Sequence, residues 1–468
     1  MELNSNSQIL ENPLQETSTS IKTTSNLNEG STICSEALNI DHASGVFLWD
    51  SSGKRYTDLF SQTWSMPLGH NNNKVIEAVK KQLSKITHLR TAYSTPEKAQ
   101  LANRILELSP TGLTKVNFVL HGSLAVEGAI KLAINYHENR DKILYLEDGF
   151  HGRSLATMGI SWKIPDSKYK NYFLNGIEVK KNLEDIEEKM ISNQPAAIII
   201  ELIQGNSGCN ILNKDLVKGI RELCNKYDVA MIVDEVQTAF GCMGVNFLCE
   251  KYEITPDIIV FGKSIGGGFP LAGTIYKEKY SFQPGDHSFT FAHNPVSLTA
   301  SLAYLKELEP ALKNVNILSP IIDESFIQLE KKYPNLRNAR VCGLKGAIDI
   351  LDSNGNPDPT RADLIVSKLL EHGVIISNSR YRHLGNTLMI QPPLIITPKQ
   401  LKKSFREFDL VLQEIYHIKK YEHPQEETTQ IQLDVSHHIK RRVHIIGHHI
   451  RHHMRHHFVR KMRRNKHG

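Results

Sequence analysis

One lysine, Lys263, stands between an apolar run and three consecutive glycines in the stretch IIVFGKSIGGGFPLAG, residues 258–273. A lysine that is desolvated against apolar neighbours has a lowered pKa and can act as a nucleophile toward a carbonyl or as a proton carrier. The alternative is a lysine at a strand end that extends to solvent. Lys263 is therefore a candidate catalytic residue whose role depends on its surroundings.

A carboxylate, Asp234, closes a second apolar run in the stretch MIVDEVQ. A buried carboxylate is unfavourable unless a cation or several hydrogen-bond donors pair with it. A protonated ring nitrogen would be such a partner, and a carboxylate that caps the following turn is the alternative.

A third apolar run, KVNFVL, is followed by His121, Gly122 and Ser123 and then by a helical pattern. The free amides and the dipole of a helix N-terminus favour an anion, glycine permits close approach, and the serine hydroxyl adds a donor. An ordinary loop and helix cap would have the same residues. Taken together, an anion cup, a carboxylate for a ring nitrogen and an amine describe a site for pyridoxal phosphate (PLP).

These three runs belong to a longer series in which short apolar segments alternate with helical patterns from about residue 70. Strands that are apolar on both faces and separated by helices indicate an α/β fold with a mainly parallel sheet. Ligands of such sheets bind outside the carboxyl ends of the strands, where Lys263, Asp234 and Gly122 are expected. Near the N-terminus, residues 45–60 contain two short β-like runs around an Asp-Ser-Ser-Gly turn, which predicts a hairpin.

From about residue 45 to 418 the chain resembles the class III PLP-dependent aminotransferases. This group contains ornithine, acetylornithine, 4-aminobutyrate, diaminopelargonate and omega-amino acid transaminases. Several family blocks occur in order: LWDSSGKRYTDLF, HGSLAVEGAIKLA, GFHGRSLATMG, ELIQG, VDEVQTAFG, PDIIVFGKSIGGGFPLAG, TFAHNPVS and PPLIIT. The resemblance implies a fold-type I PLP-dependent transferase with a seven-stranded, mainly parallel sheet in a large domain and a smaller α/β domain.

The resemblance also implies roles for residues that match the family blocks. Lys263 is similar to the lysine that forms the Schiff base (aldimine) with the cofactor and moves the substrate proton, and Asp234 to the partner of the pyridine nitrogen. The other implied cofactor contacts are Gly122 and Ser123 for the phosphate, Phe150 for stacking on the ring, Gln237 for the ring hydroxyl and Thr290 for the phosphate of the other subunit. The family therefore implies a homodimer with shared active sites.

The chain departs from the family pattern where substrates are recognised. Members that use glutamate commonly carry an arginine before the PPL block and a glutamate after IQG, and this chain has Met389 and Asn206 there. Loss of both members is coherent, because losing one alone would leave a buried unpaired charge. Glutamate is therefore not a safe choice of amino donor. Arg380 or Arg382 is an alternative carboxylate contact, and a surface role for both arginines is the other interpretation. Trp64 falls where family members place an aromatic residue near the substrate entrance, although a core tryptophan fits equally well.

Composition is that of a globular protein: 468 residues, 40% hydrophobic and 23% charged. No apolar run is long enough to span a bilayer, and the first 35 residues lack the apolar stretch of a secretory signal. The six cysteines are scattered without the spacing of a zinc site, so we expect no metal and a cytoplasmic protein with reduced thiols.

The net charge of +6 is unevenly distributed along the chain. Residues 436–468 hold 10 of the 56 Lys and Arg residues and no acidic residue, which leaves 46 basic against 50 acidic residues elsewhere. No nucleic acid is therefore expected to bind the body of the protein. The tail has the pattern of a basic amphipathic helix suited to an anionic surface or an acidic partner, and a solvated disordered extension is the alternative.

We therefore predict five regions along the chain. They are a disordered segment at 1–35, the N-terminal part of the small domain at 36–60, the large PLP-binding domain at 61–305, the C-terminal small domain at 306–420 and the basic tail at 421–468. The predicted activity is PLP-dependent transamination between a primary amine or amino acid and a keto acceptor. A racemase, decarboxylase or aminomutase on the same fold is an alternative, as is a catalytically vestigial binding protein directed by its tail.

Overall fold

The computed structural model describes residues 38–162, 169, 171, 174, 176–379 and 385–416. The predicted disordered segment 1–35 and the basic tail 421–468 lie outside the described residues, as do Arg380 and Arg382. The predictions for these segments rest on the sequence alone. In the part of the chain that the structure describes, none of the helices is long and apolar enough to cross a bilayer.

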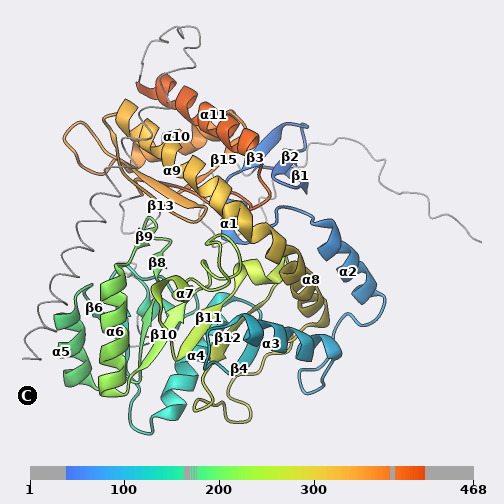
Figure 1. Ribbon diagram of the computed structural model, residues 1–468, viewed down its shortest axis with the longest axis vertical. Coiled ribbons are helices and arrows are strands. Elements are labelled where there is room, and N and C mark those ends of the chain that lie inside the picture. The colour runs from blue at the N-terminus through green and yellow to red at the C-terminus, as the bar shows by residue number, and fades with distance from the viewer. Residues whose placement is uncertain are drawn as a thin grey trace, which may run out of the picture. The chain divides into compact units, whose positions relative to one another are not determined.

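The largest sheet has seven strands and lies at the centre of the part that holds the candidate residues (Figure 1). In spatial order its strands are β4 (Lys115–Val119), β12 (Ala272–Tyr276), β11 (Ile258–Phe261), β10 (Ala230–Asp234), β7 (Ala197–Ile200), β5 (Ile143–Leu146) and β6 (Gly176–Val179). Every strand except β12 runs in the same direction, because β12 is antiparallel to both of its neighbours. The predicted seven-stranded, mainly parallel sheet of a fold-type I transferase is confirmed.

The middle strands of this sheet are buried along their whole length, as their continuous apolar sequences predict. Helix α4 (Gly122–Tyr136) packs against β11 and β12, while α6 (Lys214–Tyr227) packs against β10 and α5 (Leu183–Asn193). Helix α6 begins where the Asn213 side chain accepts the amide of Asp215, two residues along, which satisfies one free donor of the helix end. Its buried residues recur every three or four positions, so one face lies on the sheet.

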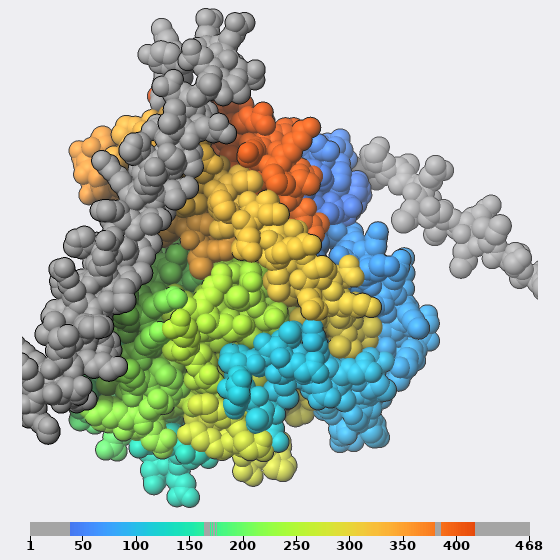
Figure 2. Space-filling model, in the orientation of Figure 1, coloured from blue at the N-terminus to red at the C-terminus, as the bar shows by residue number. Residues whose placement is uncertain are grey.

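Three further helices lie side by side next to the large sheet. They are α2 (Asn73–Leu83), α3 (Pro96–Leu108) and α8 (Pro295–Ala311). Figure 2 shows the blue N-terminal helices against the yellow α8, and both α2 and α3 contact α8. Helix α3 begins with a proline after the capping residue Thr95, whose hydroxyl accepts an amide of the first turn.

Three smaller sheets complete the described structure. Their strands are β1 (Ile40–Ser44), β2 (Phe47–Asp50), β3 (Arg55–Asp58) and β15 (Val374–Ile375) in one sheet, β13 (Leu336–Cys342), β14 (Lys345–Ile350), β17 (Thr387–Ile390) and β16 (Ser377–Asn378) in another, and β8 (Ile203–Gln204) with β9 (Asn210–Ile211) in the third. The predicted hairpin corresponds to β2 and β3. Because β3 also pairs with β15, the N-terminal hairpin shares a sheet with a distant C-terminal segment.

Long and short helices connect these sheets. The remaining elements are α9 (Val315–Lys332), α10 (Pro359–Glu371), α11 (Pro398–Tyr416), α7 (Cys249–Tyr252), α1 (Ser61–Trp64) and the 3₁₀ turns η1 (Thr157–Ile160), η3 (Lys263–Gly266) and η4 (Leu312–Asn314). The turn α1 is unusual, because all four of its residues have positive φ, between 46° and 65°. Side chains other than glycine are strained in this left-handed conformation.

Candidate active site

A cavity of about 810 Å³ lies where the carboxyl ends of β4, β10 and β11 meet. Seven of the ten predicted site residues line it. They are Gly122, Ser123, Phe150, Asn206, Asp234, Gln237 and Lys263. Residues from chain positions 122 to 263 converge here because the ends of neighbouring parallel strands share one edge of the sheet.

A single residue, Gly262, separates Lys263 from the end of β11, and Lys263 adopts a left-handed φ of 48°. Its side chain is largely enclosed by protein and is open toward the cavity. The pKa of Lys263 is lowered from 10.5 to about 7, chiefly by burial and also by the positive charge of Lys345, while Asp234 and Glu201 act in the opposite direction. A substantial fraction of the amine is therefore neutral near pH 7, which is the form that attacks a carbonyl.

Asp234 ends β10 and is 7% exposed. One of its oxygens, Oδ2, lies 2.9 Å from Nδ1 of His151, and the other accepts the amide of Val236 at 3.0 Å. His151 was missed by sequence reasoning, although it stands next to Phe150 in the GFHGR block. The carboxylate is thus held in place by two donors while it still lines the cavity.

The N-terminus of α4 opens onto the same cavity, because His121, Gly122 and Ser123 line it. The side chain of the N-cap residue His121 makes no capping hydrogen bond, so the first amides of the helix are left for an anion. A Cβ added at Gly122 would lie 3.1 Å from Val236, which explains why the smallest residue stands here. The Ser123 hydroxyl accepts the amide of Arg153 at 3.1 Å and joins the helix end to the cavity wall.

Phe150 forms another wall of the cavity and is held on several sides. Its ring centroid lies 6.1 Å from that of Trp162, and the Arg153 guanidinium lies 5.6 Å from it. Its amide donates to Glu201 at 2.8 Å. Glu201 also lines the cavity, and burial raises its pKa to about 7, with the His151 charge acting in the opposite direction.

The Gln237 side chain accepts a hydrogen bond from a second lysine that sequence reasoning missed. The Lys345 ammonium donates to Gln237 Oε1 at 3.0 Å, and Lys345 is 1% exposed. Its nitrogen lies 3.9 Å from the ring centroid of Trp64, and the Lys263 nitrogen lies 4.7 Å from the same centroid. The one sequence signal was a lysine at the start of an apolar strand, KGAIDI.

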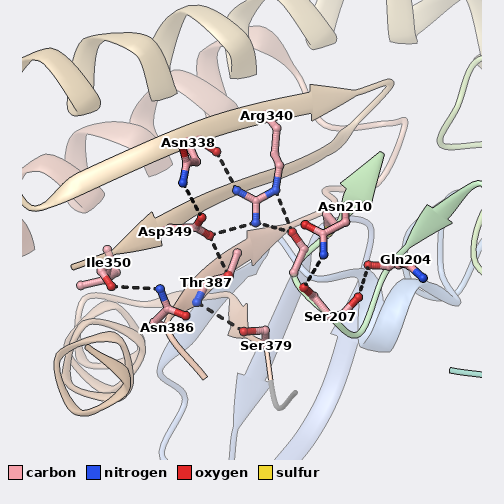
Figure 3. Close-up of polar contacts among 12 residues, drawn as sticks. Gln204, Ser207, Asn210, Asn338, Arg340, Asp349, Ile350, Ser379, Asn386 and Thr387 are labelled. Carbon is pink, nitrogen blue, oxygen red and sulfur yellow. Dashed lines mark hydrogen bonds and ion pairs between the residues drawn. The ribbon is translucent and has the colours of Figure 1, made fainter. Parts of the chain in front are cut away.

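The loop that carries Asn206 is attached to β14 and β17 through Arg340 (Figure 3). The guanidinium donates to the Gly208 carbonyl from Nε at 2.9 Å and also pairs with Asp349 at 2.9 Å. Asp349 in turn accepts the Thr387 hydroxyl at 2.7 Å. The position of Asn206 at the cavity wall therefore depends on strands that begin more than 120 residues later in the chain.

Three predicted site residues do not line this cavity: Trp64, Met389 and Thr290. Trp64 and Met389 are each 2% exposed, and Met389 pairs with Ala347 across the β14–β17 ladder. Trp64 lies in the core, where its ring contacts the two lysines. Thr290 is exposed on the surface of its own chain.

Comparison with known proteins agrees with this arrangement. Residues 31–412 match the family described as aminotransferase class-III. The acetylornithine aminotransferase of Caldanaerobacter subterraneus subsp. tengcongensis is 34% identical over 381 residues, which cover 79% of this chain and 93% of that protein. The acetylornithine aminotransferase of Archaeoglobus fulgidus is 32% identical over 370 residues, covering 78% and 93%.

Solved structures show the same fold. A transaminase from the marine bacterium Virgibacillus is 24% identical with a TM-score of 0.77, over 84% of this chain and 98% of that one. Acetylornithine aminotransferase from Elizabethkingia anophelis is 27% identical with a TM-score of 0.69, over 81% and 94%. With the family pattern matched over most of its length, the chain belongs to the class III aminotransferases, which depend on PLP.

Proposed function

We propose that this enzyme binds PLP in the cavity and uses Lys263 as its catalytic amine. The residues present fit that cofactor: the uncapped N-terminus of α4 suits the phosphate, and Asp234 suits a protonated ring nitrogen. When bound, PLP supplies an aldehyde carbon that accepts the amino group and a ring that withdraws electrons from it. The observation that carries the proposal is that the largely enclosed Lys263 amine lines the same cavity as Asp234 and the N-terminus of α4.

The side chains then have separate roles. Gly122 and Ser123 would hold the phosphate, Phe150 would stack against the ring, and Gln237 would donate to the ring hydroxyl. Lys263 would take the proton from the substrate carbon that bears the amine and hold it at its nitrogen, and the bound PLP would supply the carbon that receives it. Such a relay requires a base with a pKa near the working pH, and burial supplies this at Lys263.

For the substrate we propose a primary amine that also carries a carboxylate. Among the described residues that line the cavity, Arg153 is the arginine, and a guanidinium is the best partner for a carboxylate. Relatives named acetylornithine aminotransferase support an amino acid donor. Glutamate is expected to be a poor donor, because Met389 and Asn206 stand where glutamate-using members carry the arginine and its paired glutamate.

The test is the visible absorption spectrum of the purified protein with PLP, titrated with N-acetylornithine, ornithine, glutamate, 4-aminobutyrate and simple diamines. We expect a visible absorption band that depends on Lys263. The donors that carry a carboxylate should bleach this band, with the exception of glutamate. In Arg153→Ala these donors should require at least tenfold higher concentrations, while diamines should be unaffected. Absence of the band, or its persistence in Lys263→Ala, would overturn the catalytic role, and bleaching by glutamate would overturn the inference from Met389 and Asn206.

We also propose a homodimer in which Thr290 contributes to the site of the other subunit. Thr290 is exposed on its own chain and does not line its own cavity, which supports a role in trans. Coexpression of Lys263→Ala with Thr290→Ala tests this, because a mixed dimer would contain one intact site. Recovery of activity above that of either variant alone is expected, and no recovery would contradict the shared site.

The division of the chain into a large domain at 61–305 and a small domain at 36–60 and 306–420 is a further proposal. It is supported by the shared sheet of the N-terminal hairpin and β15. A cytoplasmic location is proposed from the scattered cysteines and is tested by fractionation of cells that express the full chain.

A further inference from the structure

Lys345 is a buried lysine without an acidic partner in the part of the chain that the structure describes. It is 1% exposed, and its ammonium makes one hydrogen bond, to Gln237 Oε1 at 3.0 Å. The face of the Trp64 ring, 3.9 Å away, is its other favourable contact. An isolated ammonium is costly to bury, so a lysine here requires an explanation beyond packing.

The Trp64 ring brings Lys345 close to Lys263. The two nitrogens lie 3.9 and 4.7 Å from one ring centroid, so their separation is at most the sum of these distances. The ring is held there by α1, whose four residues have left-handed φ, and by Ser264, whose hydroxyl donates to the Trp64 carbonyl at 3.3 Å. Strained backbone of this kind persists where the surrounding structure demands it, and it is often found at active sites.

The hydrogen bond from Lys345 also decides how the Gln237 amide is oriented. A lysine can only donate, so the oxygen of Gln237 must face Lys345 and the amide nitrogen is left for the cavity that Gln237 lines. Gly205 leaves the space for this arrangement, because a Cβ at that position would overlap Gln237 Oε1. Gln237 therefore presents a donor, not an acceptor, to a bound molecule.

We propose that Lys345 is a positioning residue of the reaction: its buried charge disfavours a second positive charge on Lys263, and its hydrogen bond turns the Gln237 amide nitrogen toward the cavity. This inference deepens the role proposed for Lys263. A neighbouring cationic group is a known way to keep a catalytic lysine neutral. Lys345 therefore acts on the reaction through Lys263 and Gln237, although Lys345 itself does not line the cavity.

The other groups that act on Lys263 do not replace this effect. Asp234 and Glu201 favour its charged form, while the Cys242 thiol is buried and its pKa is raised to about 12, so it is uncharged near neutral pH. Of the charged side chains that act on Lys263, Lys345 is the one that opposes protonation. At the largest separation that these two distances allow, about 8.6 Å, and an effective dielectric constant of about 20, its charge shifts the titration of Lys263 by about one pH unit.

The experiment measures the titration of Lys263 in the full chain without cofactor. Acetic anhydride labels neutral amines, and mass spectrometry reports the labelled fraction of Lys263 at each pH from 6 to 10. We expect the labelling midpoint to lie near neutral pH in the wild type and about one pH unit higher in Lys345→Met. Lys345→Arg, which keeps the charge, should stay close to the wild type, as should Lys368→Met, which removes an exposed charge of α10.

A second variant keeps the test decisive if Lys345→Met does not fold. Lys345→Gln retains a donor for Gln237 but has no charge, so it should raise the labelling midpoint like Lys345→Met. An unchanged midpoint in either folded variant would overturn the electrostatic role of Lys345. Failure of the proposed function is a separate result, because it appears as the absence of a Lys263-dependent visible band in the wild type with PLP.

Discussion

Replacement of Lys263 by methionine should stabilise the protein that lacks cofactor, and this stabilisation should depend on pH. Methionine keeps most of the length of the side chain and removes the ionisable group from a largely enclosed position. The native pKa of Lys263 is about 7, against 10.5 for a free lysine. A difference of this size corresponds to a burial cost of at most about 5 kcal/mol when the amine is protonated in both states.

The sign of the pH dependence follows from the direction of the shift. Because the pKa of Lys263 is lowered in the native state, the unfolded chain binds more protons between pH 7 and 10.5. The free energy of unfolding of the wild type should therefore rise relative to Lys263→Met through this window, by about 3 kcal/mol between pH 7 and 9.5. Below pH 7 the difference between the two proteins should be constant.

Urea unfolding of both proteins without cofactor, followed by circular dichroism at several pH values, measures this difference. Groups distant from Lys263 titrate equally in the two proteins, so the difference between their unfolding free energies reports Lys263 together with the groups that interact with its charge, such as Glu201. Lys368→Met provides a control with an exposed lysine and should show no such trend. Parallel pH profiles for the wild type and Lys263→Met would refute the assignment of Lys263 as a buried amine with a lowered pKa.

Three further substitutions test other parts of the site. Gly205→Ala should displace the Gln237 amide, because the added methyl overlaps the amide oxygen. It should therefore weaken PLP binding at least tenfold in a spectroscopic titration, and unchanged PLP affinity would contradict the close contact between residue 205 and Gln237. Gln62→Gly should raise the thermal midpoint through a gain of about 1 kcal/mol, since residue 62 has φ of 47°, and a lower midpoint would argue against strain in α1. Arg340→Met should destabilise the protein by about 2–3 kcal/mol and speed amide hydrogen exchange around Gly208, because the Gly208 carbonyl and Asp349 lose their donor. Protection around Gly208 equal to that of the wild type would exclude a role of Arg340 in holding this loop.

Local sequence pattern predicted most of the elements around the site. The apolar runs KVNFVL (115–120), MIVDEVQ (231–237) and IIVFG (258–262) became β4, β10 and β11 with ends that differ by a few residues. The antiparallel strand β12 was not singled out from the sequence. It is buried along its whole length like its parallel neighbours, so its residue pattern carries no sign of its direction.

The chemistry of the cofactor site also follows from local sequence, for a physical reason. Lys263, Asp234 and the Gly122–Ser123 pair each lie at or just after the end of a strand, and strands that run in parallel end at one edge of the sheet. Knowing the strands was therefore enough to bring these four residues together at the cavity. Phe150, Gln237 and Asn206, which also line the cavity, were predicted from the family resemblance.

The contacts behind the cavity wall depend on tertiary structure alone. Lys345 reaches Gln237 across 108 positions of sequence, and Arg340 reaches Gly208 across 132, from a sheet whose packing has no local signal. Whether Trp64 and Met389 face a substrate or the core depends on the same packing, and both are buried. The sequence by itself determined which candidate residues meet at the edge of the sheet, because strand ends are set by local pattern. Only the tertiary structure decided how their charges are tuned, because electrostatic effects act through space among residues that are distant along the chain.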